Sequence, residues 1–234
     1  MNINSNGYVL IFAVGVCVAT SLTLAVAANS LREIQAAAKE FDRQKNVMIA
    51  AGLCTADDPR PREELEKLYE DRVEEFVIDT ESGAKTDMEP LEADGKRYRV
   101  VATTKAEGGE VEAYVLPISG RGLWSTLYGY LALDGDKNHV RGITFYDHKE
   151  TPGLGGEVDN PQWQNQWKGK TVLDEDGDLV SVTVKKGNVD PSIEREKKHA
   201  VDGLAGATIT GKGVETFVEA DLRAFSKYLY NKGD

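Results

Sequence analysis

The residues best suited to chemistry lie in a segment of small residues, 202–213, directly before an amphipathic stretch near the C-terminus. Two hydroxyls, Thr208 and Thr210, stand where a helix is expected to start, and the first N–H groups of a helix lack helical partners and favour an anion. A phosphate bound or attached to such a hydroxyl would lie at the positive end of the helix dipole. Thr210 could also cap the helix. The alternative is that the segment is only a well-capped helix start.

The same segment comes close to a nucleotide-binding P-loop, because Gly206, Gly211 and Lys212 have the spacing G-x-x-x-x-G-K. However, Gly213 stands where the motif requires a Ser or Thr to bind magnesium. The preceding residues 194–199 are charged, whereas a P-loop follows a buried strand. The sequence therefore disfavours a nucleotide triphosphatase.

A second segment, residues 150–157 with the sequence ETPGLGGE, also has an unusual composition. Its proline and three glycines disfavour a regular helix or a central strand. The glycines would let a flat ligand or another backbone approach closely, although an ordinary long turn explains the same residues. The segment does not match a dinucleotide fingerprint, because no G-x-G-x-x-G opens a helix after a strand here.

The composition argues against several other kinds of site. With 28 Lys and Arg against 39 Asp and Glu, the net charge is −11. This balance disfavours a nucleic-acid binder, since neutralising phosphates requires clustered basic residues. Two cysteines, Cys17 and Cys54, are too few for a disulfide scaffold or a four-cysteine cluster. The three histidines lack the paired spacing of a zinc enzyme, and no catalytic set of side chains stands out: His139, His148 and His199.

The N-terminus carries an apolar run, residues 8–28, without a charged side chain. At about 1.5 Å per residue a helix over this run spans the ~30 Å hydrocarbon layer of a membrane. A cleavable signal peptide is the alternative, because residues 25–27 have a small-x-small pattern. Residues 1–7 hold no Lys or Arg, so we expect a short tail and then an uncleaved anchor. Basic residues after the run would, by the positive-inside tendency, hold the following chain in the cytoplasm.

Residues 29–74 are expected to form a helical stalk. Apolar residues between positions 31 and 51 fall near one helical face, and Gly52 is a natural C-terminal stop. This helix could continue the anchor helix into water. A second helix is expected to begin near residues 58–59, with an apolar stripe of Leu65, Leu68 and Val73.

From residue 75 to residue 234 the pattern changes to short β-rich runs separated by turns with Gly, Asp and Asn. We expect strands at residues 76–78, 98–101, 113–118, 123–133, 140–146 and 179–184. We also expect a short helix at residues 161–167 and a longer C-terminal helix, in which apolar residues from Val214 to Leu229 recur at helical spacing. The predicted fold class is α+β, with a mostly antiparallel sheet and flanking helices.

Residues 202–208, DGLAGAT, closely resemble the flavinylation motif D-G-x-(S/T)-G-A-T of the FMN-binding domain family. In that family a flavin transferase moves FMN from FAD onto the final threonine and forms a phosphoester. The resemblance places this ester on Thr208. Ala205 replaces the usual Ser or Thr, but the hydroxyl lost there is not the attachment atom, so we expect the modification to survive. The resemblance also assigns the remaining motif residues to the cofactor site: Asp202, Gly203, Gly206 and Ala207.

Other segments narrow the resemblance to the C subunits of Na+-translocating NADH:quinone reductases, over nearly the whole chain. They are the anchor and residues 43–53, 123–125, 142–146 and 150–163. This resemblance implies an FMN electron carrier in a six-subunit membrane complex, the Nqr complex, that couples NADH oxidation and ubiquinone reduction to Na+ translocation. It implies a bacterial inner-membrane location with the flavin domain on the periplasmic side, contrary to the charge pattern. The alternatives are the flavin-carrying G subunit of an Rnf-type electron-transport complex and a membrane-anchored scaffold without a cofactor.

The glycine-rich loop after residue 149 is the expected neighbour of the flavin ring. Its backbone can lie close to a flat aromatic, and a threonine there can offer a hydrogen bond. On this expectation we assign five of its residues to the cofactor site: Glu150, Thr151, Gly153, Leu154 and Gly155. Trp124 and Tyr146 are candidate stacking partners, although large aromatic residues more often belong to a core.

Overall fold

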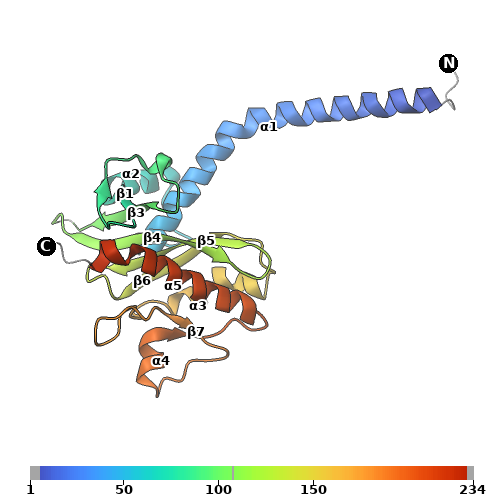
Figure 1. Cartoon of the computed structure of the whole chain (residues 1–234). Helices are drawn as coiled ribbons and strands as arrows, with labels where there is room; N and C mark the ends of the chain where they lie inside the picture. Colours follow the sequence, from blue (N-terminus) through green and yellow to red (C-terminus); the bar gives the residue numbers. More distant parts are fainter. Residues whose placement is uncertain (1–5, 107, 231–234) are drawn as a thin grey trace. The chain divides into compact units, whose positions relative to one another are not determined.

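The computed structural model describes residues 6–106 and 108–230 (Figure 1). The chain divides into two compact units between Asp42 and Arg43. Helix α1 (Asn6–Ala50) contributes to both units. The second unit holds all the strands of the described chain. It also contains the residues assigned to the cofactor site, at 150–155 and 202–208.

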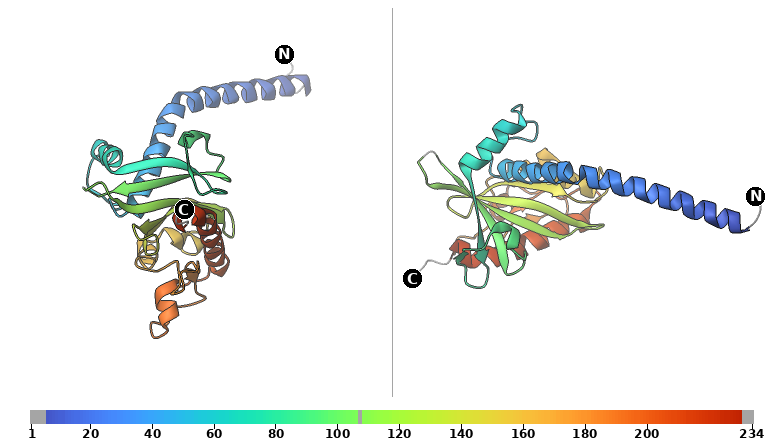
Figure 2. Two further views of the ribbon diagram at one scale, coloured as in Figure 1. Left: turned by 60° about the vertical axis from the view of Figure 1, so that its left-hand side comes forward. Right: turned by 90° about the horizontal axis from the view of Figure 1, so that it is seen from above.

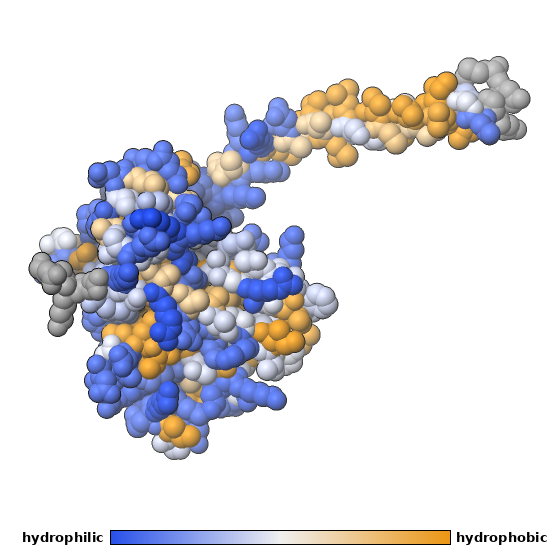
Figure 3. Space-filling model, in the orientation of Figure 1, coloured by the Kyte–Doolittle hydropathy of each residue, from blue (hydrophilic) through white to orange (hydrophobic). Residues whose placement is uncertain are grey.

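The first unit consists of the N-terminal part of α1, which is long and apolar enough to cross a membrane. Its most apolar stretch has a mean hydropathy of 2.5 and none of it is buried. Figure 3 shows hydrophobic residues along this part of the helix. The exposure argues against a core helix, because a core helix buries its apolar side chains within the protein.

We expect the full chain to remain with the membrane after an alkaline carbonate wash, because the apolar part of α1 has no other apolar surface to pack against within its unit. A chain that begins at Arg43 lacks this part of the helix and should be recovered without detergent. Fractionation of both forms by ultracentrifugation measures the difference. Release of the full chain by the wash would contradict an anchoring role for the helix.

The helix expected at residues 31–51 is the continuation of the anchor helix, since α1 runs unbroken to Ala50. It ends in a left-handed glycine: Gly52 has φ 72°, and the next N–H, of Leu53, donates to the carbonyl oxygen of Met48 at 2.8 Å. This is the common glycine-terminated helix end. Buried residues near this end, Val47 and Met48, belong to the second unit.

Helix α2 (Arg62–Arg72) begins later than the sequence predicted. Asp58 does not cap it, because its carboxylate accepts hydrogen bonds from the backbone and guanidinium of Arg60. Pro61 stands at the N-cap instead. Val73, expected on the apolar stripe of this helix, is the first residue of the first strand.

A six-stranded antiparallel sheet with the order β2-β1-β3-β4-β5-β6 forms the centre of the second unit. Its strands are β1 (Val73–Asp79), β2 (Lys85–Thr86), β3 (Tyr98–Lys105), β4 (Val111–Arg121), β5 (Thr126–Asp134) and β6 (Val140–Asp147). Two short strands pair in parallel outside this sheet, β7 (Thr183–Val184) and β8 (Ala200–Val201). The predicted α+β class with a mostly antiparallel sheet is therefore confirmed.

Short helices connect the remaining segments: η1 (Pro90–Glu92), η2 (Gly155–Asp159), α3 (Pro161–Asn165) and α4 (Glu194–His199). Three sequence predictions were too long. The strand expected from residue 123 begins at Thr126, the strand expected at 179–184 is reduced to β7, and α3 stops before residue 167. In the first case the three residues before the strand form a turn, which is held by the buried carboxylate of Glu150.

Helix α5 (Thr208–Tyr230) lies along one face of the sheet (Figures 1 and 2). The predicted apolar residues form its buried face: Val214, Phe217, Val218, Leu222, Phe225 and Leu229. The helix packs closely on β4, since a Cβ at Gly120 would lie 2.2 Å from the Cβ of Phe217. A largely buried ion pair between Arg99 and Asp221, 2.8 Å long, also joins sheet and helix. These contacts fix where the N-terminus of α5 lies.

Candidate functional site

The segment 202–207 is fixed to its surroundings mainly through Asp202. The carboxylate of Asp202 accepts the N–H of Val189 at 2.7 Å. Its own N–H donates to the Gln166 side chain at 2.9 Å, and its carbonyl oxygen accepts the indole N–H of Trp163 at 2.8 Å. Asp202 thus anchors the start of the motif to two other segments of the fold, one at α3 with the residue that follows it and one at Val189.

Two glycines of the motif lie where a side chain is disfavoured, each for a different reason. A Cβ on Gly203 would lie 2.2 Å from the carbonyl oxygen of Lys185, and the Gly203 N–H donates to the carbonyl oxygen of Gly187 at 2.7 Å. Gly206 has φ 68°, and a Cβ there would lie 2.8 Å from a methyl carbon of Leu154. The motif therefore requires glycine at position 203 for the close approach of the backbone, and at position 206 for the left-handed conformation.

We expect Gly203→Ala to lower the free energy of unfolding by about 1–3 kcal/mol, because the added methyl group meets a backbone carbonyl that cannot rotate away. Gly108→Ala is a suitable control, since a Cβ at Gly108 meets nothing within 4 Å. Urea denaturation of the two variants measures the effect. Equal midpoints for Gly203→Ala and the wild type would contradict the close approach.

Helix α5 starts at Thr208, and its first internal hydrogen bond runs from the N–H of Gly211 to the carbonyl oxygen of Ala207 at 3.0 Å. Thr208 is exposed, whereas Ala207 is buried. The prediction that Thr210 caps the helix is wrong, because Thr210 lies inside the first turn and its buried hydroxyl donates to Glu150 at 2.7 Å. The hydroxyl that projects from the start of the helix is that of Thr208.

Glu150 is a buried carboxylate that joins three segments. It accepts the N–H groups of Trp124 at 2.9 Å, of Ser125 at 3.1 Å and of Leu123 at 3.3 Å, as well as the Thr210 hydroxyl. Burial alone would raise the pKa of Glu150. The hydrogen bonds from Thr210 and from the three N–H groups outweigh burial and lower the pKa below its usual value. Glu150 is therefore held ionised by its neighbours.

The structure brings the two segments singled out in the sequence against each other. A Cβ on Gly155 would lie 2.7 Å from both the Thr210 hydroxyl oxygen and a Glu150 carboxylate oxygen, and Leu154 lies beside Gly206. Gly153 turns the loop with φ 75°. Thr151 accepts the N–H groups of residues 154 and 156 through its carbonyl oxygen, and its side chain is exposed.

Four exposed apolar residues lie next to this junction, and we call them the apolar rim. Leu123 and Trp124 donate their N–H groups to Glu150, Leu154 lies beside Gly206, and Ile209 directly precedes Thr210. Trp124 is 68% exposed, which is unusual for so large an apolar side chain. Trp124 therefore does not belong to the core.

Tyr146, the second candidate stacking residue, lies on the other face of the sheet from α5. It stacks on Tyr130 with ring centroids 5.4 Å apart, and the neighbouring Thr144 hydroxyl on the same face bonds to the carbonyl oxygen of Asn46. Phe145, which points the opposite way, contacts Phe217 of α5. Tyr146 thus contributes to the packing behind the sheet rather than to this site.

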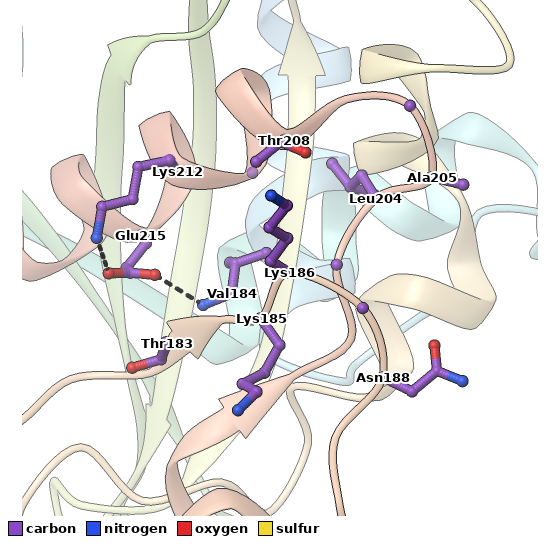
Figure 4. A pocket seen from close by; sticks show the side chains of 14 residues that line it. Thr183, Val184, Lys185, Lys186, Asn188, Leu204, Ala205, Thr208, Lys212 and Glu215 are labelled. Atoms are coloured by element: carbon purple, nitrogen blue, oxygen red, sulfur yellow. Dashed lines mark hydrogen bonds and ion pairs between the residues drawn. The ribbon is translucent and has the colours of Figure 1, made fainter.

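A cavity of about 740 Å³ opens beside Thr208 (Figure 4). One wall is residues 183–188, and the other is residues 203–206 with the first turns of α5. Lys185, Lys186 and Asn188 in the first wall were not predicted from the sequence. They reach the motif only because β7 pairs with β8, directly before residue 202.

Neither cysteine lies in this site, and among the histidines only His148 contacts it. Burial raises the pKa of the Cys54 thiol to about 11, so it is protonated at neutral pH, and Cys17 lies in the apolar part of α1. His148 helps to position the loop, because its ring accepts the N–H of Glu150 and bonds to Asp159 at 2.7 Å. Within the described residues no group of three or more potential ligands is placed to hold a metal ion.

Comparison with known proteins agrees with this geometry. The FMN-binding domain family matches residues 122–223, a range that includes the buried carboxylate, the glycine-rich loop and the motif. A crystal structure of the C subunit of the Na+-translocating NADH-quinone reductase from Parabacteroides distasonis superposes with a TM-score of 0.72 at 28% identity, covering 87% of this chain and 98% of that one. The crystal structure of NqrC from Shewanella oneidensis has a TM-score of 0.69 at 27% identity, covering 83% and 98%.

Full-length relatives extend the similarity along the chain. The C subunit of the Na+-translocating NADH-quinone reductase of Pseudomonas aeruginosa is 39% identical, with 98% of this chain and 97% of the relative covered. The protein of the same name from Yersinia pestis is 36% identical, with 92% and 87% covered. This identity favours the Nqr-type reductase over the Rnf-type alternative, and the domain match argues against a scaffold without a cofactor. The chain belongs to the family of Na+-translocating NADH-quinone reductase C subunits.

Proposed function

We propose that this chain carries FMN as a phosphoester on Thr208 and acts as one electron carrier in a membrane complex that oxidises NADH, reduces ubiquinone and translocates Na+. The observation that carries the proposal is the position of Thr208. It is the last residue of the motif 202–208, the first residue of α5 and exposed beside a large cavity.

The surroundings of Thr208 fit a phosphate ester. Its hydroxyl is accessible to a flavin transferase, and the N–H groups of the first turn of α5 have no partners within the helix. The N-terminal end of a long helix stabilises negative charge. Glu150 lies nearby, but both its oxygens are already engaged by neutral donors, and it is buried behind Thr210. The ester is thus held where the backbone favours an anion.

The apolar rim fits the flavin ring. Trp124, Leu154 and Ile209 expose apolar surface next to the motif, and a flat aromatic group would cover that surface. When bound, FMN supplies the electron-transfer chemistry, whereas the chain supplies placement and electrostatics. Glu150 contributes by fixing the turn that carries Trp124 and the helix turn that carries Ile209, and Gly153 lets the loop fold between them.

The assembly and its orientation complete the proposal. The relatives are named as subunits of a Na+-translocating reductase, so we propose that this chain assembles with the other subunits of a six-subunit complex and receives its flavin from a dedicated transferase. We place the flavin domain on the periplasmic side of the bacterial inner membrane. A membrane-impermeant maleimide should label Lys168→Cys in intact spheroplasts, because Lys168 is exposed on the second unit. Labelling only after lysis would show that the flavin domain faces the cytoplasm.

Intact-mass measurement tests the attachment. After co-expression with a flavin transferase, the mass of the chain should increase by one FMN less one water molecule. The same chain expressed without the transferase should keep its unmodified mass. An unmodified and colourless chain after co-expression would support the scaffold alternative and contradict the proposal.

A further inference from the structure

The cavity beside Thr208 carries an excess of positive charge, although the protein as a whole has a net charge of −11. Three lysines and one glutamate line it: Lys185, Lys186, Lys212 and Glu215. The attached flavin would place one negative phosphodiester charge at Thr208. The lysines are therefore the groups that can balance it, and their existing partners decide which of them is available.

Two of the three lysines are already paired. Lys212 forms an ion pair with Glu215, whose other carboxylate oxygen accepts the N–H of Val184 at 3.1 Å (Figure 4). Lys185 forms an ion pair with Glu196 of α4. Either lysine would have to break its existing ion pair in order to approach Thr208.

Lys186 differs from both. In the described part of the chain its ammonium has no hydrogen bond and no ion pair, and its side chain is exposed. Figure 4 shows this ammonium pointing towards Thr208 across the cavity that both residues line. The cavity thus holds one uncompensated positive charge facing the one hydroxyl proposed to carry an anion.

We propose that Lys186 is the counter-ion of the phosphodiester on Thr208 and positions the phosphate end of the attached flavin. The inference rests on the proposed function, since it needs the ester at Thr208. Lys186 forms no bond to the reacting part of the flavin and is a positioning residue. The net charge of the chain is −11, and this excess of negative charge disfavours a further anion such as the ester. An unpaired lysine beside Thr208 offsets that repulsion where the ester would form.

Phosphorus NMR of the flavinylated full chain in detergent tests the pairing directly. Lys186→Gln should shift the phosphodiester resonance relative to the wild type, and Lys186→Arg should restore it. Lys168→Gln is the matched control, because Lys168 is likewise exposed but does not line the cavity. The control resonance should coincide with that of the wild type.

A thermodynamic cycle measures the same contact independently. Attaching FMN should favour the folded state about threefold more in the wild type than in Lys186→Gln, which is the size of one exposed ion pair. The difference should vanish near 1 M salt, where the Debye length falls to about 3 Å. Urea unfolding of the loaded and unloaded forms of both chains gives the four values.

The outcomes separate this inference from the proposed function. An ester whose phosphorus resonance is the same in the wild type and in Lys186→Gln, with no difference in the cycle, would overturn the role of Lys186 and leave the flavin carrier intact. A wild-type chain without any ester after co-expression with the transferase would overturn the proposed function and this inference together.

Discussion

Thr208→Ala is expected to reduce covalent flavin from one FMN per chain to none. The alanine removes the only atom of residue 208 that can form the ester, and it leaves α5 intact because Ala is the strongest helix former. In-gel flavin fluorescence after denaturation, followed by intact-mass measurement, gives the FMN content. Covalent flavin on the Thr208→Ala chain would show that another residue is the attachment site.

Two further variants act as controls for that result. Thr208→Ser keeps a hydroxyl at the start of α5 and should still be flavinylated. Thr210→Val removes the other hydroxyl of the first turn, which donates to Glu150, and should lower the free energy of unfolding by about 1–2 kcal/mol while the flavin remains attached. If Thr210→Val folds but carries no flavin, the ester is on Thr210 and not on Thr208.

Glu150→Ala is expected to lower the free energy of unfolding by about 3–5 kcal/mol, the largest stability effect in this site, because each buried donor left without an acceptor costs about 1–3 kcal/mol. The substitution leaves three backbone N–H groups and the buried Thr210 hydroxyl without their acceptor. The turn that carries Trp124 and the first turn of α5 would then lose their common contact. Urea denaturation of the variant measures the loss. A midpoint within experimental error of the wild type would contradict the joining role of Glu150.

The stability that Glu150 contributes should depend on pH in a definite direction. The pKa of Glu150 in the folded chain is lower than in the unfolded chain, because the hydrogen bonds to the carboxylate outweigh the effect of burial. Its contribution is therefore present above the unfolded value of about 4.3 and is lost as the pH falls through the folded value. Glu150→Gln cannot ionise, so the stability difference between wild type and this variant should be largest at neutral pH and shrink below about pH 4. A difference that grows on acidification would contradict the assignment.

Much of the fold follows from local patterns in the chain. The apolar repeat from Val214 to Leu229 predicted the buried face of α5, and short β-rich runs between turns predicted most strands of the sheet. Both signals, helical spacing and β-rich composition between turns, are carried by neighbouring residues. The uncharged run at the N-terminus likewise predicted the apolar part of α1, because its length and composition suffice.

Two of the errors arose where a distant residue decides the local structure. The turn before Thr126 interrupts a β-rich run because Glu150, far along the chain, accepts three of its N–H groups. The same carboxylate takes the hydroxyl of Thr210, which in isolation resembles a helix cap. Short-range propensity could not predict either case, since tertiary contacts override it.

The site was only partly predictable for the same reason. The motif 202–208 and the loop from Glu150 to Gly155 were visible as unusual compositions, and the structure shows that they touch. The lysines of residues 183–188 had no such signal, because they face the motif only through the pairing of β7 with β8. Tyr146 was grouped with Trp124 by residue type alone, and the pleat of β6 separates them.

The most direct test of the flavin carrier is peptide mass spectrometry on protein isolated from its native membrane. A protease digest should give the fragment that contains residues 202–208 with one FMN less one water, and fragmentation should place the added mass on Thr208. Recovery of that fragment only in its unmodified form, or with the flavin on a different residue, would contradict the account.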